Sequence, residues 1–141
     1  MTDLRIRRVI AARPERIFHA WTKPELLLQW WGPAGVRCIV AEVDLKSGGA
    51  YRIGNELPDG TVVWISGTYE LVDSPHRLVY SWRVGQEPES RVTVSFTEVA
   101  EGSTEVVIHH EQIHSTAVRD DHAFGWNGCL DGLARWVTQA P

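Results

Sequence analysis

Four histidines in the last third of the chain are the side chains best suited to chemistry near neutral pH. His109 and His110 precede Glu111, and His114 and His122 follow them along the chain. An imidazole can transfer protons near neutral pH, contact a ligand carbonyl or hydroxyl, or bind a metal ion. This segment therefore offers three chemistries: metal binding, acid–base catalysis and polar ligand recognition.

Metal binding fits the spacing of these residues poorly. In a strand, His110 and His114 share a face but stand about 13 Å apart at ~3.3 Å per residue, too far to bind one ion together. His109 and Glu111 share the other face and would need further ligands from elsewhere. No cysteine stands near them, so we expect no bound metal.

His110 is the histidine that strand alternation places on an apolar face, together with Val106 and Ile108. It could contact a polar group of a ligand or act as an acid or base. It could equally be a buried side chain satisfied by a neighbour such as Trp126 or by a backbone carbonyl. We expect His110 to serve ligand contact and not proton transfer, with His122 beside it on a helix.

Motifs for covalent catalysis and nucleotide binding are not apparent. The chain has no G-x-S-x-G, G-x-G-x-x-G or G-x-x-x-x-G-K-[ST] motif. Cys38 and Cys129 lie outside any C-x-x-C spacing, and Cys129 stands among apolar residues of a predicted helix, where a thiol is usually inert. We expect two reduced, buried cysteines, no catalytic residue and no cofactor.

Aromatic side chains give a stronger indication of a binding site, since the chain has seven tryptophans. Alternation places most of the aromatic group formed by Trp64, Tyr80, Trp82, Phe96 and Trp126 on one covered face. An apolar cavity with a few polar groups is typical of a small-molecule site, although the same residues could form a solid core. The predicted ligand-binding residues are Trp64, Tyr80, Trp82, Phe96, His110, His122, Trp126, Cys129 and Leu130.

Proline, glycine and hydrophobic periodicity predict the elements that position these residues. Residues 3–11 predict a strand, and Pro14 and Pro24 each open a short helix, over residues 14–22 and 24–31. Turn-forming residues then separate six further strands, which hairpin-length connections make antiparallel. We expect these strands at residues 36–45, 50–57, 61–72, 77–85, 90–99 and 104–113.

The last predicted element is a helix over residues 116–139, which must cover the apolar face of the sheet. Three glycines in this helix, Gly125, Gly128 and Gly132, each cost about 1 kcal/mol relative to alanine in a helix interior. Either the helix packs very closely there, or space is left for another molecule. The covering side chains form two adjacent rows, Trp126, Leu130, Leu133 and Val137 beside His122, Gly125, Cys129, Gly132 and Trp136.

Composition narrows the class of protein. The 141 residues suit a single domain over residues 1–141, and the formal charge of −4 is scattered along the chain. No concentrated basic face indicates nucleic-acid binding, and no long apolar run or signal-peptide stretch indicates membrane insertion or export. We expect a cytoplasmic protein, with a two-fold homodimer as the default assembly.

Short sequence motifs follow one another in a specific order along almost the whole chain. They are Pro14-Glu15-Arg16-Ile17-Phe18, Ala20-Trp21-Thr22, Pro24-Glu25, Trp30-Trp31-Gly32-Pro33, Asp44 with Gly48-Gly49, Asp59-Gly60, Gly67-Thr68-Tyr69, Pro75-His76-Arg77-Leu78-Val79-Tyr80, His110-Glu111, and Gly125-Trp126 with Leu130 and Leu133. In this order the chain resembles the START-like (SRPBCC, helix-grip) superfamily. Within it, the chain is similar to homologues of the activator of the ninety-kilodalton heat-shock protein ATPase.

The resemblance implies an α+β helix-grip fold. In this fold a curved seven-stranded antiparallel sheet, with two short helices after the first strand, holds a long C-terminal helix on its concave face. In related proteins the cavity between sheet and helix holds lipids, polyketides or other apolar molecules. Our leading hypothesis is therefore a protein that binds a small apolar or amphipathic ligand without bond-making chemistry.

Two alternatives remain open. One is a small enzyme of the cyclase, dehydratase or hydrolase type, which would use His110 or His122 as acid or base in the same cavity. The other is a co-chaperone that stimulates a heat-shock ATPase, which we rank last. The expected partner is thus a small apolar ligand, with a chaperone as the less favoured alternative.

Overall fold

The first and last strands of the chain lie side by side. In the computed structural model, which describes residues 1–139, β1 (Thr2–Ile10) pairs antiparallel with β7 (Ser103–Ile113). The other strands are β2 (Arg37–Val43), β3 (Ala50–Glu56), β4 (Val62–Asp73), β5 (Arg77–Val84) and β6 (Ser90–Ala100). Together they form a seven-stranded sheet in the order β1-β7-β6-β5-β4-β3-β2, and every neighbouring pair is antiparallel.

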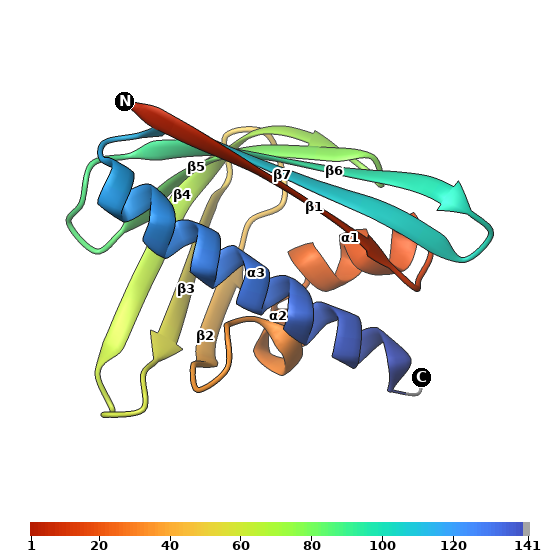
Figure 1. The fold of residues 1–141 in the computed structure, drawn as a ribbon, viewed down its shortest axis with the longest axis horizontal. Helices are drawn as coiled ribbons and strands as arrows, with labels where there is room; N and C mark the ends of the chain where they lie inside the picture. Colours follow the sequence, from red (N-terminus) through yellow and green to blue (C-terminus); the bar gives the residue numbers. More distant parts are fainter. Residues whose placement is uncertain (140–141) are drawn as a thin grey trace.

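Within the described residues, three helices accompany this sheet. α1 (Pro14–Thr22) and α2 (Pro24–Trp30) follow β1, and α3 (Thr116–Thr138) follows β7. Figure 1 shows α3 crossing beneath the curved sheet, with α1 and α2 near its C-terminal half. This arrangement confirms the predicted α+β helix-grip fold. Within residues 1–139, no helix has both the length and the apolar character needed to cross a membrane.

Proline and serine define where the helices begin. Pro14 and Pro24 occupy the first turns of α1 and α2, where a missing N–H removes no helical hydrogen bond. Ser115 caps α3, because its hydroxyl accepts a hydrogen bond from the Val118 N–H at 3.1 Å. α2 ends one residue before its predicted end, and Gly32 follows with a φ of +109°, a conformation that favours glycine.

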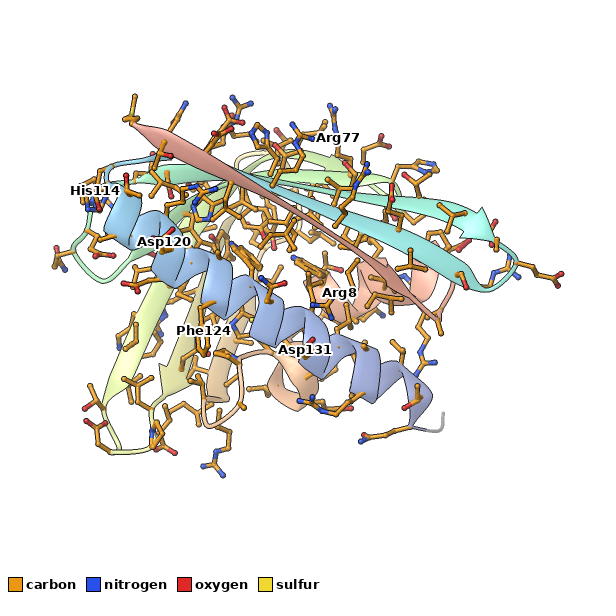
Figure 2. The ribbon with its side chains drawn as sticks, viewed as in Figure 1. Arg8, Arg77, His114, Asp120, Phe124 and Asp131 are labelled. Atoms are coloured by element: carbon orange, nitrogen blue, oxygen red, sulfur yellow. The ribbon has the colours of Figure 1, made fainter. Side chains whose placement is uncertain are left out.

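An apolar stripe packs α3 on the sheet, and an exposed ion pair lies beside it. On its outer side, Arg8 of β1 donates a hydrogen bond to the Asp131 carboxylate at 2.7 Å, and Figure 2 shows both residues at this contact. Burial of the inner side confirms the first predicted helical row and part of the second. The buried residues of α3 are Trp126, Cys129, Leu130, Leu133 and Val137.

Candidate ligand-binding site

A cavity lies between the N-terminal half of α3 and the strands β3, β4 and β5. Its volume is about 170 Å³. Asp121 of α3 borders the cavity and is exposed, so the cavity opens to solvent at this end. The lining residues are Trp31, Pro33, Asn55, Ile65, Trp82, Val84, Asp121, His122, Gly125, Trp126 and Cys129.

Tryptophan rings form the inner wall of this cavity. The ring centroids of Trp82 and Trp126 lie 5.0 Å apart, and Trp31 packs edge-on against Trp126 at 5.6 Å. Behind them, Trp21 stacks on Trp126 at 6.2 Å, and Trp30 packs against Trp21 and Trp31. We refer to these five residues as the tryptophan cluster. These residues come from α1, α2, the loop after α2, β5 and α3. The wall therefore forms only when these distant segments pack together.

His122 connects the cavity wall to Trp82. Its Nε2 accepts a hydrogen bond from the Trp82 indole N–H at 3.0 Å, and its Nδ1 lies 2.8 Å from the Val118 carbonyl. An indole N–H can only donate and a carbonyl can only accept, so this ring is the neutral Nδ1–H tautomer. Both nitrogens of His122 therefore have partners within the protein.

His110 lies behind the wall and has no exposed surface. Its Nδ1 accepts a hydrogen bond from the Trp126 N–H at 3.1 Å, and its Nε2 lies 2.7 Å from the Ser90 hydroxyl. Because that hydroxyl donates to the Trp82 carbonyl at 3.3 Å, His110 Nε2 donates to the Ser90 oxygen. Burial lowers the pKa of His110 to about 3, and the neighbouring His122 adds to this effect.

His110, which the sequence analysis expected to contact a ligand, has no ring nitrogen free for that contact. Both ring nitrogens are bonded inside the protein, and the ring does not line the cavity. A histidine with a pKa of about 3 also remains unprotonated near neutral pH, which makes it unsuited to general acid catalysis. The sequence left open that His110 is a buried side chain that is hydrogen-bonded to Trp126. The structure agrees with this alternative.

Asn55 is a polar residue of the cavity wall that the sequence analysis missed. Its side chain is 7% exposed, and its Oδ1 has no hydrogen-bond partner among the described residues. Alternation along β3 places Asn55 on the inner face with Tyr51 and Ile53, which are both buried. The sequence could therefore have indicated Asn55, because this polar residue lies near the end of an otherwise apolar face of the strand.

The sequence analysis expected the glycines of α3 either to allow close packing or to leave space for another molecule, and the structure has both arrangements. Gly128 packs against Pro33, and a Cβ at this position would overlap the proline ring. A Cβ on Gly132 would lie 3.0 Å from the Trp30 carbonyl oxygen. Gly125, by contrast, lines the cavity, and no atom lies within 4 Å of the position its Cβ would occupy. The helix packs closely at two glycines and leaves space at the third.

Three of the predicted site residues lie in the packed core and do not line this cavity. Phe96 packs edge-on against Phe18 at 5.7 Å, and Leu130 is fully buried. Tyr80 accepts a hydrogen bond from the Trp21 N–H at 3.2 Å and borders a separate space of only about 20 Å³. Four predicted residues do meet at the cavity: Trp82, His122, Trp126 and Cys129.

The predicted position of Trp64 on the covered face is wrong. Its side chain is 36% exposed, and the Arg52 guanidinium lies 4.4 Å from its ring centroid. In the β3–β4 pair Trp64 lies opposite Gly54, whereas Ile65 lies opposite the buried Ile53, and opposite residues share a face of the sheet. Ile65 therefore lines the cavity, and Trp64 lies on the outer face.

The remaining candidate groups are not arranged for reaction chemistry. Burial raises the pKa of the Cys129 thiol to about 12 and that of Cys38 to about 11. His109 pairs with Asp3 at 2.9 Å, and both side chains are partly or largely exposed. Within residues 1–139, no group of three or more His, Cys, Asp or Glu side chains could hold a metal ion.

Comparison with known families identifies the relatives of this chain. The model of the family described as "Activator of Hsp90 ATPase homolog 1-like protein" matches residues 11–138. The chain belongs to this family. The match confirms the resemblance seen in the sequence motifs, and it spans every element from α1 to α3. A comparison with curated proteins finds no match.

Solved structures similar to this member of the activator-homologue family share its fold over nearly the whole chain. A protein from Chromobacterium violaceum is 27% identical, with a TM-score of 0.88 over 98% of each chain. A protein from Rhodobacter sphaeroides is 26% identical, with a TM-score of 0.86 over 99% of this chain and 95% of the other. An HSP90 activator from Plasmodium falciparum is 25% identical, with a TM-score of 0.76 over 98% and 97%.

Proposed function

We propose that the protein binds a small apolar or amphipathic molecule in the cavity between α3 and strands β3 to β5. The observation that carries this proposal is the cavity of about 170 Å³ bordered by Trp31, Trp82 and Trp126. Small-molecule sites are typically concave and mostly apolar, with a few polar groups that orient the ligand. The neutral, fully bonded His110 and His122 support binding over acid–base catalysis.

The dimensions of the cavity limit what can enter it. A dry apolar cavity of about 150 Å³ is large enough to hold benzene. A cavity of about 170 Å³ therefore fits a single ring system or a compact alkyl group. Phe124 stands one helical turn from Asp121, is 78% exposed, and projects from α3 in Figure 2. A longer molecule would extend from the open end of the cavity towards Phe124.

A matched pair of substitutions at Gly125 tests this proposal. Gly125→Ala adds one methyl group where the structure has free space, whereas Gly125→Phe fills the cavity. We expect a panel of apolar molecules to change the tryptophan fluorescence of the wild type and of Gly125→Ala saturably, because Trp82 and Trp126 line the site. Gly125→Phe should not respond, and native mass spectrometry of the same samples should count the bound molecules.

Two controls keep this experiment decisive. Circular dichroism checks that Gly125→Phe folds, and Val84→Trp fills the same cavity from the sheet side. Undiminished binding by both filled variants would place the ligand elsewhere. The absence of a saturable response to every chemical class in the wild type would contradict the proposal.

We propose as a second candidate function the stimulation of a heat-shock ATPase. Two observations favour it: the family is described by that activity, and the Plasmodium falciparum relative is an HSP90 activator. The ATPase rate of a purified chaperone of this class, measured with increasing amounts of the protein, tests it. A saturable increase in the rate would support the function, and an unchanged rate would contradict it.

A further inference from the structure

We infer that Trp82 limits the ligand of the cavity to a single ring, because its indole separates the cavity from a second apolar space behind it. This inference rests on the proposed ligand-binding function and names the residue that selects the size of the ligand. Two observations carry it: Trp82 borders both spaces, and its neighbours hold its ring between them.

The second space lies between the short helices α1 and α2 and the inner face of strands β2 to β5. Its volume of about 20 Å³ suffices for about one water molecule and is too small for an organic ligand. Its lining residues are all apolar or aromatic, and all of them are buried except the half-buried Val43. An enlarged form of this space would therefore suit an apolar group.

Two tryptophans form the partition between the spaces. Trp31 and Trp82 are the described residues that border both, and their ring centroids lie 6.3 Å apart. Trp31 also packs against Trp21, Trp30 and Trp126, so it belongs to the packed centre of the tryptophan cluster. Trp82 differs, because a third space, of about 10 Å³, also borders it. Among the described residues Trp82 alone borders all three spaces, so its ring is the one that keeps them apart.

The Trp82 ring is held in this partition by its neighbours. Its N–H donates a hydrogen bond to His122 Nε2 at 3.0 Å, and its ring centroid lies 5.0 Å from that of Trp126. The residue is only 5% exposed, so rotation out of this position would leave a buried donor unpaired, which is unfavourable. A ligand that needs more room than the cavity offers would therefore overlap the indole, and such a steric clash gives specificity.

Phenol and 4-phenylphenol test this limit, because they differ by one ring and share the same polar group. In the wild type, the second ring of 4-phenylphenol must remain at the open end of the cavity. In Trp82→Ala it can enter the space that the indole leaves. We expect 4-phenylphenol to bind this variant at least about tenfold more tightly than the wild type, since burying an aromatic ring favours binding by that factor. Phenol should bind the variant no more tightly, and isothermal titration calorimetry measures each dissociation constant.

Trp64→Ala is the matched control. It also removes one indole, but from the outer face of the sheet, so both dissociation constants should equal those of the wild type. Trp82→Phe removes less of the partition and should give a smaller gain in 4-phenylphenol binding. This variant keeps the test valid if circular dichroism shows that Trp82→Ala does not fold.

Val43→Phe, added to Trp82→Ala, tests where the second ring lies. Val43 borders the second space and not the cavity. A phenyl ring at this position should fill the enlarged space and return the dissociation constant of 4-phenylphenol to the wild-type value. Phenol binding should not change, because the cavity itself is not filled.

Three results would overturn the inference. Equal binding of 4-phenylphenol by the wild type and the folded Trp82 variants would show that the indole does not limit the ligand, and would leave the proposed function intact. A gain that phenol shares, or that persists after Val43→Phe, would show that Trp82 does not separate the two spaces. If neither compound binds while the wider apolar panel still does, the inference alone fails; if nothing binds, the proposed function fails with it.

Discussion

At the scale of single residues, two histidines accept the indole N–H groups of two tryptophans that line the cavity. The rings of His110 and His122 lie edge to face with centroids 4.8 Å apart, and each accepts the N–H of one cavity tryptophan. Only a neutral imidazole can accept a hydrogen bond, so this arrangement requires both rings to remain unprotonated. Without these acceptors, the two buried indole N–H donors would be unpaired. Each unpaired donor would lower the free energy of unfolding by about 1–3 kcal/mol.

His110 should make the stability of the fold depend on pH. Its pKa is lowered from an ordinary 6.5 to about 3, so between these values the unfolded chain binds a proton that the folded chain does not. The free energy of unfolding should therefore fall as pH drops below 6.5, by up to about 1.4 kcal/mol per pH unit from this group. Urea unfolding of His110→Gln should show a shallower decrease than the wild type. His19→Gln, at an exposed position of α1, is the control and should follow the wild type.

Replacing Trp64 by alanine and replacing Trp126 by alanine should have very different effects on the free energy of unfolding. Trp126 is 2% exposed in the centre of the tryptophan cluster, so its removal should lower the free energy of unfolding by about 3–5 kcal/mol. Trp64 is 36% exposed and packs on Gly54 and Arg52 at the outer face, so its removal should lower the free energy of unfolding by about 1–2 kcal/mol. Chemical denaturation measures both values. Similar losses at the two positions would contradict the assignment of Trp64 to the outer face.

At the scale of elements, α3 combines tight packing and open space along one helix. Gly128 and Gly132 let the helix approach the segment that runs from Trp30, the last residue of α2, to Pro33. Gly125, one turn earlier, leaves the space that belongs to the cavity. Glycines that weaken an isolated helix thus improve its packing against the rest of the molecule at two positions and form part of the candidate site at the third.

Alanine substitutions at two of these glycines should change stability in opposite directions. Gly125→Ala meets no neighbouring atom and gains helix propensity, so it should stabilise the protein by about 1 kcal/mol. Gly128→Ala places a methyl group against Pro33 and should destabilise it by about 1–3 kcal/mol. Differential scanning calorimetry would show one melting temperature above and one below that of the wild type. A stabilised Gly128→Ala would mean that α3 is not closely packed at Pro33.

At the scale of the whole molecule, α3 closes the concave side of the sheet and encloses both thiols. Cys38 on β2 and Cys129 on α3 are free and buried, and burial raises both pKa values. A thiol reagent reacts with the thiolate, so reaction requires the structure to open around these residues.

Thiol labelling should therefore report how the helix leaves the sheet. At pH 8 we expect Cys129 in a Cys38→Ser variant to react orders of magnitude more slowly than in the urea-unfolded chain. A cavity ligand should slow the reaction further, because it stabilises the closed form by mass action. Native-state labelling as fast as that of the unfolded chain would contradict the burial of Cys129.

Much of the architecture could be predicted from local patterns. The predicted helix over residues 14–22 has the observed bounds of α1, and the helix predicted over residues 116–139 ends one residue earlier, at Thr138. Alternation also identified Val92, Val94 and Phe96 as members of the buried face. These patterns depend on neighbours a few residues apart, because helix and strand periodicity are properties of the local backbone.

The details of the candidate site depended on contacts between distant segments. Alternation shows that Trp64 and Ile65 lie on opposite faces of β4, but only the pairing with β3 decides which face is covered. The hydrogen bond from Trp126 to His110 joins a helix to a strand, and no spacing along the chain predicts it. The sequence by itself determined the elements, their order and the apolar face of strands β5 to β7. Only the tertiary structure decided which side chains border the cavity, because that depends on how α3 and the strands meet in space.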